Sequence, residues 1–214
     1  MSSEGLPPTF EIDLRLTRGN HTVAVRLATG SGITALFGPS GVGKTSILDM
    51  VAGLVRPDDG RIAVAGEVLF DSAAGIDLPP EKRQCGYVFQ DLRLFPHRTV
   101  EDNLLFGWRR RGRQAGWMGP AEVTAFLGID HLRQRMPANL SGGEAQRVAI
   151  GRALLCGPRF LAMDEPLSSL DRPRRGDILG LIERMRDELR LPILYVTHDH
   201  AEIERLGARV VELG

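Results

Sequence analysis

Residues 38–45 read GPSGVGKT, which matches the pattern G-x-x-x-x-G-K-[ST] of loops that hold phosphate groups. The apolar run 33–37 precedes this P-loop and a helical pattern follows it, so we expect the loop to join a strand to a helix. The backbone N–H groups of such a loop turn inward, and the helix N-terminus adds partial positive charge. An isolated glycine-rich turn with a solvated lysine is the alternative, and the flanking strand and helix argue against it. The predicted phosphate-binding residues are Gly38, Pro39, Ser40, Gly41, Val42, Gly43, Lys44, Thr45 and Ser46.

Two side chains of this loop and two carboxylates farther along are predicted to act on the phosphates. Lys44 is expected to reach the β- and γ-phosphates of a nucleotide, and the Thr45 hydroxyl is expected to ligate Mg²⁺. The apolar run 160–163 ends in Asp164 and Glu165. A strand-end aspartate holds Mg²⁺ in P-loop enzymes, usually through water, and we assign that role to Asp164. Glu165 is then predicted to polarise the attacking water as a general base, whereas a plain turn closing the strand is the alternative.

Gln90 and His198 also follow predicted strands, at 86–89 and 193–196. The C-terminal ends of strands in an open parallel sheet face one ligand crevice, so we expect both residues on one rim with Asp164 and the P-loop. The Gln90 amide is predicted to reach the metal and the water from the side. An isolated histidine beside a strand end is more often a capping or packing residue, and here the shared rim favours a functional one. The predicted catalytic residues are Glu165, His198, Gln90 and Lys44, and the predicted metal ligands are Thr45, Gln90 and Asp164.

The segment 140–144, LSGGE, has the pattern of a helix N-terminus with an unusual first turn. Ser141 and Glu144 fit the S-x-x-E capping box, in which two side chains satisfy free backbone N–H groups. Gly142 and Gly143 each cost a helix interior about 1 kcal/mol relative to alanine. Because glycines carry no side chain, they leave the positive end of the helix open to an anion.

The first third of the chain predicts antiparallel strands on either side of the P-loop. Residues 10–27 alternate apolar and polar side chains around a turn, which predicts a half-buried hairpin. Residues 57–78 combine glycines with short β patterns and predict a further antiparallel patch. After the P-loop we expect a helix, on which apolar residues recur at helical spacing: Ile47, Leu48, Val51 and Leu54.

The last third predicts a parallel sheet. Apolar strands at 160–163 and 193–196 flank a helix at 173–190, and strand–helix–strand at this spacing is typical of parallel α/β proteins. Between them and the first third, the pattern changes to short helices. We expect one α/β domain over 1–214, with 1–90 and 156–214 forming the core and an antiparallel β subdomain, and 91–155 forming an inserted helical subdomain.

Composition narrows the class of protein. Of the 214 residues, 43% are hydrophobic and 25% are charged, and the formal net charge is zero, so bulk charge favours neither nucleic acid nor lipid. The sequence has no run of about 18 apolar residues and no signal-peptide pattern at its start. Cys85 and Cys156 lack metal-site spacing and suit a reducing compartment. We expect a cytosolic protein whose membrane role, if it has one, depends on a partner.

Together these motifs resemble the ATP-binding-cassette (ABC) ATPases. The matching segments occur in the family's order and span nearly the whole chain: GPSGVGKT, YVFQ, LSGGE, LAMDEP, SSLD and VTHD. The resemblance implies a RecA-like P-loop NTPase core with an antiparallel β subdomain and a helical subdomain that carries LSGGE, the signature. It also implies ATP and Mg²⁺ as cofactors.

The resemblance further implies a homodimer with ATP at its interface. Two copies are expected to face each other head to tail, so that each nucleotide meets the P-loop of one chain and the signature of the other. Asp171, in SSLD, is predicted to contact the nucleotide site, although it could equally cap the helix at 173–190. The signature residues predicted to meet the nucleotide are Ser141, Gly142, Gly143 and Glu144.

A narrower resemblance is to the ATPase subunits of molybdate importers, carried by residues 66–104 and by the signature segment. It implies integral-membrane permease partners, an extracytoplasmic substrate-binding protein, no nucleic-acid partner, and a peripheral position on the cytoplasmic face of the inner membrane. Sulfate, tungstate or another anion remains the alternative cargo. Relatives of this kind usually carry a C-terminal oxyanion-sensing domain, and we expect that domain to be absent or trimmed here.

Other functions and two local features stay open. An ABC ATPase of nucleic-acid maintenance or translation is expected to carry a coiled-coil insertion or a second cassette, and a non-hydrolysing sensor is expected to lack Glu165 or His198; this sequence fits neither. Residues 15–20 have no aromatic side chain to stack on adenine, so Phe10 or His21 could substitute or the base could be weakly recognised. The basic patch 109–113, flanked by Trp108 and Trp117, is a solvated loop, a contact for lipid headgroups or permease, or a contact for nucleic acid.

Overall fold

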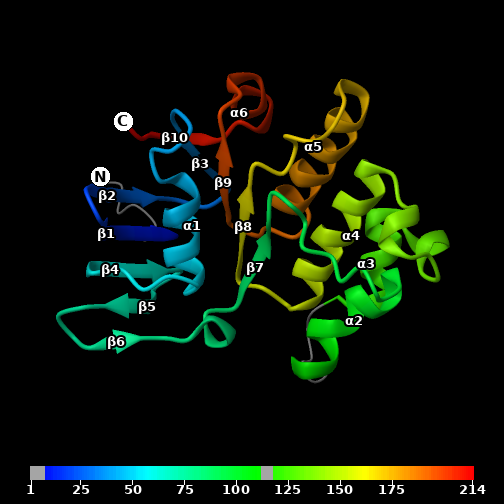
Figure 1. The fold of residues 1–214 in the computed structure, drawn as a ribbon, viewed down its shortest axis with the longest axis horizontal. Coiled ribbons are helices and arrows are strands. Elements are labelled where there is room, and N and C mark those ends of the chain that lie inside the picture. The colour runs from blue at the N-terminus through cyan, green and yellow to red at the C-terminus, as the bar shows by residue number, and fades with distance from the viewer. Residues whose placement is uncertain (1–7, 112–117) are drawn as a thin grey trace, which may run out of the picture.

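The computed structural model describes residues 8–111 and 118–214, and the strands in these ranges form two five-stranded sheets (Figure 1). One sheet is parallel and has the strand order β10–β3–β9–β8–β7. The other is antiparallel and has the order β2–β1–β4–β5–β6. The protein therefore has the mixed α/β architecture that its sequence predicts.

The parallel sheet is the centre of the molecule. Two of its three inner strands, β8 and β9, are buried at every position, as expected where both faces of a parallel sheet are covered. Its edge strand β10 was not anticipated from the sequence, because its short apolar run looks like an ordinary chain end. The strands are β3 (Ile33–Phe37), β7 (Cys85–Val88), β8 (Phe160–Asp164), β9 (Ile193–Thr197) and β10 (Arg209–Glu212).

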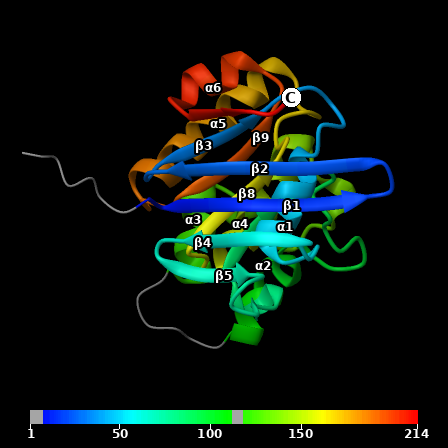
Figure 2. The same cartoon turned by 90° about the vertical axis from the view of Figure 1, so that its left-hand side faces the viewer.

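The antiparallel sheet confirms the predicted hairpin and the predicted antiparallel patch (Figure 2). In the hairpin, Phe10 pairs with Thr29 and Arg18 pairs with His21, which leaves a two-residue turn. Alternate residues of its first strand are buried, as the alternation of side chains predicts. The strands are β1 (Phe10–Arg18), β2 (His21–Thr29), β4 (Asp59–Val64), β5 (Glu67–Asp71) and β6 (Ile76–Asp77).

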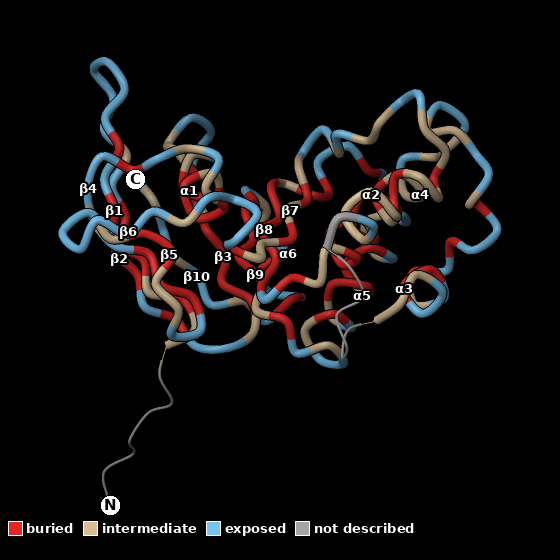
Figure 3. Tube along the Cα trace, turned by 90° about the horizontal axis from the view of Figure 1, so that it is seen from below, coloured by how far each residue is buried: buried red, intermediate tan, exposed pale blue. Residues whose placement is uncertain are grey.

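The two faces of the parallel sheet are covered by different elements (Figure 3). Phe160 and Ala162 of β8 pack with α1 (Lys44–Ala52) and the antiparallel sheet. Leu161 and Met163, which point the opposite way, pack with helices on the other face. Those helices are α4 (Gly142–Leu155), α5 (Arg172–Asp187) and α6 (His200–Leu206). Helices α1 and α4 therefore lie on opposite faces of the sheet.

The helix after the P-loop is shorter than its apolar pattern predicts. Ile47, Leu48 and Val51 are buried on α1, but Leu54 lies beyond the end of the helix and is 48% exposed, so its predicted place on the helix is wrong. The helix ends at Ala52 because Gly53 adopts the left-handed conformation with φ of 82°. The helix predicted at 173–190 likewise ends earlier, at Asp187.

The helices of the middle segment pack on α4. They are α2 (Val100–Arg111) and α3 (Pro120–Leu127). The 3₁₀ turns in the described residues are η1 (Pro80–Lys82), η2 (Asp130–Leu132) and η3 (Pro137–Asn139). Within the predicted basic patch, Arg109 pairs with Asp102 at 3.3 Å, whereas the side chains of 110–117 lie outside the described residues. None of the helices in the described ranges has both the length and the apolar character needed to span a bilayer.

Candidate active site

The P-loop connects β3 to α1 at the C-terminal edge of the parallel sheet, where the sequence places it. Gly43, immediately before the helix, has φ of 104°, and a Cβ on it would lie 2.5 Å from a methyl group of Val23. Only glycine suits that position, because of both its backbone conformation and its packing. Within the described residues, no side chain caps α1, so its first N–H groups remain available to a ligand.

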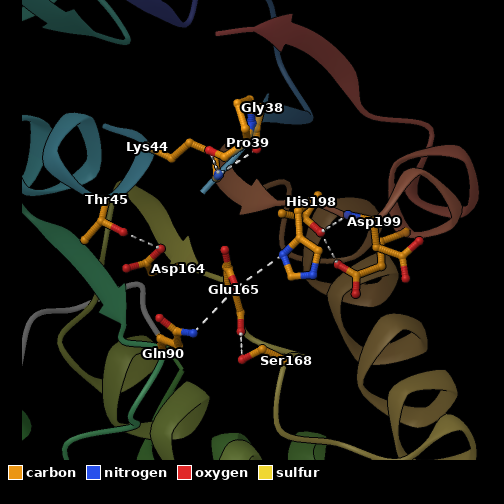
Figure 4. Close-up of polar contacts among 12 residues, drawn as sticks. Gly38, Pro39, Lys44, Thr45, Gln90, Asp164, Glu165, Ser168, His198 and Asp199 are labelled. Atoms are coloured by element: carbon orange, nitrogen blue, oxygen red, sulfur yellow. Dashed lines mark hydrogen bonds and ion pairs between the residues drawn. The ribbon is translucent and has the colours of Figure 1, made fainter. Parts of the chain in front are cut away.

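Lys44 lies inside the loop and is only 5% exposed. Its Nζ donates hydrogen bonds to the carbonyl oxygens of Gly38 at 2.7 Å and Pro39 at 2.8 Å (Figure 4). These bonds hold the ammonium group in the arch of the loop, beside the free N–H groups. A phosphate in this arch would meet a positive charge already in position.

Thr45 and Asp164 form the predicted metal-binding pair. The Thr45 hydroxyl donates to Oδ1 of Asp164 at 3.1 Å. Burial raises the pKa of the Asp164 carboxyl, and the charges of Glu165 and Asp49 act in the same direction. A buried carboxylate beside a hydroxyl is a pair of oxygen donors that suits a hard divalent cation such as Mg²⁺. The residues present therefore fit the metal that the sequence predicts.

Asp164→Asn is expected to raise the melting temperature of the nucleotide-free chain at neutral pH by about 2–4 °C. The pKa of Asp164 is higher in the folded than in the unfolded chain, so the ionised carboxylate lowers the free energy of unfolding as pH rises through that window. An amide removes this charge and can still accept from Thr45. Differential scanning fluorimetry between pH 4 and pH 8 measures the effect, which should shrink toward pH 4. A variant less stable than wild type across this range would contradict the assignment.

Glu165 receives the two other predicted catalytic side chains. Gln90 Nε2 donates to Glu165 Oε2 at 3.5 Å, and His198 Nδ1 lies 3.4 Å from the same oxygen (Figure 4). Glu165 has φ of 41°, a left-handed conformation that is rare outside glycine and often occurs at functional sites. Its N–H donates to Val196 and its carbonyl accepts from the Ser168 hydroxyl, so the turn is held from two sides. Three strand ends thus bring their polar side chains together at one carboxylate.

A buried network that sequence reasoning missed holds the turn that carries His198. The Thr197 hydroxyl donates to Glu202 at 2.8 Å and accepts from the N–H of Asp199 at 3.0 Å. The Tyr195 hydroxyl donates to the same Glu202 oxygen at 2.8 Å. In the sequence, this network is indicated only by a hydroxyl residue, Thr197, placed directly before His198.

An acidic cleft of about 500 Å³ opens beside the metal-binding pair. Two of its lining residues, Asp49 and Tyr87, were not anticipated as site residues. Asp49 follows Thr45 by four residues and so lies on the same face of α1. Residues lining this acidic cleft include Thr45, Asp49, Tyr87, Phe89, Gln90, Arg93, Asp164 and Ser168.

The signature forms the capping box predicted for it. The N–H of Ser141 donates to Glu144 at 2.7 Å, and the N–H of Glu144 donates to the Ser141 hydroxyl at 3.4 Å. Gly142 is exposed, and a Cβ on Gly143 would meet nothing closer than Arg174 at 3.6 Å. The chain's own packing therefore does not require glycine at 143. Helix α4 lies across the sheet from α1, so the signature and the P-loop of one chain adjoin helices on opposite faces of the sheet.

Burial and capping bear on three of the remaining residues. Asp171 caps α5 by accepting from the N–H of Arg174 at 3.0 Å, which is the structural alternative foreseen for it; its contact with nucleotide stays a prediction. Phe10 is fully buried with its ring against Phe160, so the idea that Phe10 stacks on adenine is wrong. His21, by contrast, is exposed at the start of β2.

A strand, P-loop and helix at the C-terminal edge of a parallel sheet, with a buried strand-end aspartate beside them, define a P-loop nucleotide-binding domain. The family model for ABC transporters matches residues 21–168, which is more than half of the chain. The chain belongs to the ABC transporter family. The matched range includes the P-loop, Gln90, the signature and Glu165, whereas Asp171 and His198 lie beyond it.

Curated relatives with the name "Molybdenum import ATP-binding protein ModC" are about half identical to this chain. The protein from Rhodospirillum rubrum is 53% identical over 202 residues, which cover 94% of this chain and 55% of the relative. That from Brucella abortus is 52% identical over 202 residues, which cover 94% and 56%. The chain thus spans about half the length of the curated relatives it matches.

Solved structures agree on the fold. Dimeric MJ0796, described as a bacterial ABC transporter cassette, superposes with a TM-score of 0.75 at 25% identity, covering 95% of this chain and 93% of that one. CbiO1 from Clostridium perfringens, described as part of the ABC transporter complex cbiONQ, superposes with a TM-score of 0.80 at 25% identity, covering 97% and 85%.

Proposed function

We propose that this chain binds ATP with Mg²⁺ and hydrolyses it to power uptake of molybdate through a membrane permease. The observation that carries the proposal is the convergence of Gln90 and His198 on Glu165, beside the Thr45–Asp164 pair. A phosphate-binding protein without hydrolysis would not need a carboxylate held by two polar partners at that place. The division into a core at 1–90 and 156–214 and a helical subdomain at 91–155 is part of this proposal.

In the proposed reaction the groups of the site divide the work, and Gln90 takes part in two tasks. P-loop N–H groups and Lys44 hold the β- and γ-phosphates, and Thr45 and Asp164 hold the metal, with Gln90 as a further ligand. Bound Mg²⁺ neutralises the charge that develops on the phosphate oxygens. Glu165 accepts a proton from the attacking water as a general base. Gln90 and His198 keep the Glu165 carboxylate aimed, because both contact its Oε2.

The active site is proposed to be completed by a second copy of the chain. P-loop and signature adjoin different helices, which pack on opposite faces of the sheet. A head-to-tail homodimer would bring the P-loop of each copy to the signature of the other. The open N-terminus of α4, at Ser141, Gly142, Gly143 and Glu144, would then meet the γ-phosphate. Solved dimers of a similar cassette support this arrangement.

Gly143→Asp is expected to lower ATP turnover about 10- to 100-fold without lowering thermal stability. An aspartate in the first turn of a helix is favourable to the helix itself, and the space beside Gly143 accepts a Cβ. The added negative charge would, however, face the partner's γ-phosphate. Steady-state turnover and melting temperature measure the two effects. Gly180→Asp, on α5, is the matched control; equal loss in both variants would contradict the dimer site.

The permease is proposed to dock in an aromatic groove of about 320 Å³ between β7 and the helices α2 and α4. The groove is mostly apolar and its rings are covered by arginines: Arg93 lies over Phe89, and Arg152 over Phe95. Such a surface suits a short amphipathic helix of a membrane protein. This docking would place the chain peripherally on the cytoplasmic face of the inner membrane. The residues lining the aromatic groove are Tyr87, Phe89, Arg93, Phe95, Phe106, Gly107, Arg152, Ala153 and Cys156.

Molybdate is proposed as the cargo because the relatives that are about half identical are molybdenum importers by name. The cargo itself would be delivered by an extracytoplasmic binding protein and would not touch this chain. The test is ATP turnover of the chain reconstituted with its permease and binding protein in liposomes. Stimulation by molybdate is expected. Stimulation by sulfate alone would overturn the cargo, and no stimulation by any anion would overturn the importer function.

A further inference from the structure

Tyr87 connects two elements: strand β7, which precedes Gln90, and helix α1, which follows the P-loop. Its hydroxyl donates a hydrogen bond to Oδ1 of Asp49 at 2.9 Å. Asp49 lies one helical turn after Thr45, whose hydroxyl contacts Asp164. The bond therefore connects β7 directly to the metal-binding face of α1.

The ring of Tyr87 is also the first member of a stack of side chains that continues through Phe89 to Arg93. Tyr87 and Phe89 are stacked with their centroids 4.1 Å apart and their planes 18° apart. The guanidinium of Arg93 lies 4.1 Å from the centroid of Phe89. These three residues line both the acidic cleft and the aromatic groove. They form a shared wall, and Gln90 lies in the segment of chain between Phe89 and Arg93.

We propose that the Asp49–Tyr87 hydrogen bond is a positioning contact that fixes this shared wall, and with it Gln90, against the P-loop helix. The inference rests on the proposed function, in which Gln90 acts on Glu165 and the groove receives the permease. A helix seated in the groove would press on the rings of the wall. With the bond to Asp49 in place, that pressure would move Gln90 relative to Thr45 and Asp164. Without the bond, the strand would move independently of the P-loop helix.

The chemistry of the pair suits a fixed contact. Burial raises the pKa of Tyr87, and the charge of Asp49 raises it further, so the hydroxyl stays protonated and can always donate. A hydrogen bond to an ionised carboxylate is roughly twice as strong as one between neutral groups. The bond is distinct from catalysis itself, because neither side chain contacts Glu165, Lys44 or Gln90 in the described hydrogen-bond network.

The test is a double-mutant cycle on steady-state ATP turnover of the full chain. Tyr87→Phe keeps the stacked ring and removes only the donor, whereas Asp49→Ala removes the acceptor. Each is expected to lower kcat about 5- to 10-fold with KM for ATP changed less than 2-fold, because the P-loop contacts are intact. The double variant is expected to be no slower than either single one. Asp49→Asn, whose amide oxygen can still accept, is expected to restore kcat to within 2-fold of wild type.

A second readout needs no turnover. Hydrogen–deuterium exchange of the segment 88–94 in the nucleotide-free chain is expected to speed up in Tyr87→Phe and Asp49→Ala but not in Asp49→Asn. The inference would be overturned if the losses of kcat added in the double variant, or if Asp49→Asn were as slow as Asp49→Ala. In either case, ATP turnover by the wild-type chain would leave the proposed function standing. A wild-type chain with no Mg²⁺-dependent turnover would contradict the proposed function itself, and the exchange rates would then decide whether the bond fixes the wall.

Discussion

Glu165→Gln is expected to lower the rate of ATP hydrolysis about 100- to 10,000-fold and to leave ATP bound. The substitution keeps the size of the side chain and its left-handed turn, but an amide cannot accept a proton from water. Gln90 and His198 would still surround it, so the site should remain assembled around an intact nucleotide. Single-turnover hydrolysis and ATP retention on a filter measure the two parts of the prediction.

The control for this substitution is Glu188→Gln, which makes the same chemical change at an exposed residue paired with Arg184. It is expected to hydrolyse ATP at the wild-type rate. Turnover of Glu165→Gln within a few-fold of wild type would remove Glu165 as the general base. Asp164 would then be the nearest carboxylate left to take that role.

Lys44→Ala is expected to weaken ATP binding about 100-fold or more. Charge-assisted hydrogen bonds contribute about 1.5–3 kcal/mol each, and Lys44 is positioned to give two of them to the phosphates. The substitution also leaves the carbonyls of Gly38 and Pro39 without their donor, so a small loss of stability is expected. Isothermal titration with ATP and Mg²⁺ measures the affinity.

The chain supplies a matched control for this change, because its other lysine, Lys82, is exposed in the 3₁₀ turn η1. Lys82→Ala is expected to bind ATP as wild type does. If Lys44→Ala bound ATP with unchanged affinity, the nucleotide would have to be held elsewhere than at the P-loop.

Much of the site could be predicted because a parallel sheet collects its strand ends at one edge. Once the sequence placed Gln90, Asp164 and His198 after apolar strands, their meeting at that edge followed from geometry. The contacts of Gln90 and His198 with Glu165 confirm that they meet. The capping box of the signature was equally accessible, because it depends only on residues three apart.

Contacts that depend on tertiary packing could not be predicted. Phe10 alternates correctly for a strand, but the sequence does not say that its ring packs on Phe160 across the core. Leu54 continues a helical pattern that Gly53 interrupts. The pairing of Asp49 with Tyr87 joins residues 38 apart in sequence, and a polar residue on an amphipathic helix is normally solvated.

The proposed dimer gives a role to the glycines of the signature. Their own chain leaves room for a side chain at 143, yet Ser141 and Glu144 already stabilise the helix start. At 142 a Cβ would lie 3.2 Å from a methyl group of Leu170, so packing within the chain favours glycine there. At 143 the chain makes no such demand, and our proposal assigns that open position to a ligand that approaches from outside the chain. In the proposed dimer, that ligand is the nucleotide bound by the second copy.

The most direct test mixes two variants with impaired ATP turnover, Lys44→Ala and Gly143→Asp. In a head-to-tail dimer of the two, one site combines both defects, while the other combines an intact P-loop with an intact signature. Half of randomly formed dimers are mixed, so the mixture is predicted to recover about a quarter of wild-type ATP turnover. A mixture no more active than the sum of its two components would contradict the claim that each active site is completed by the partner chain.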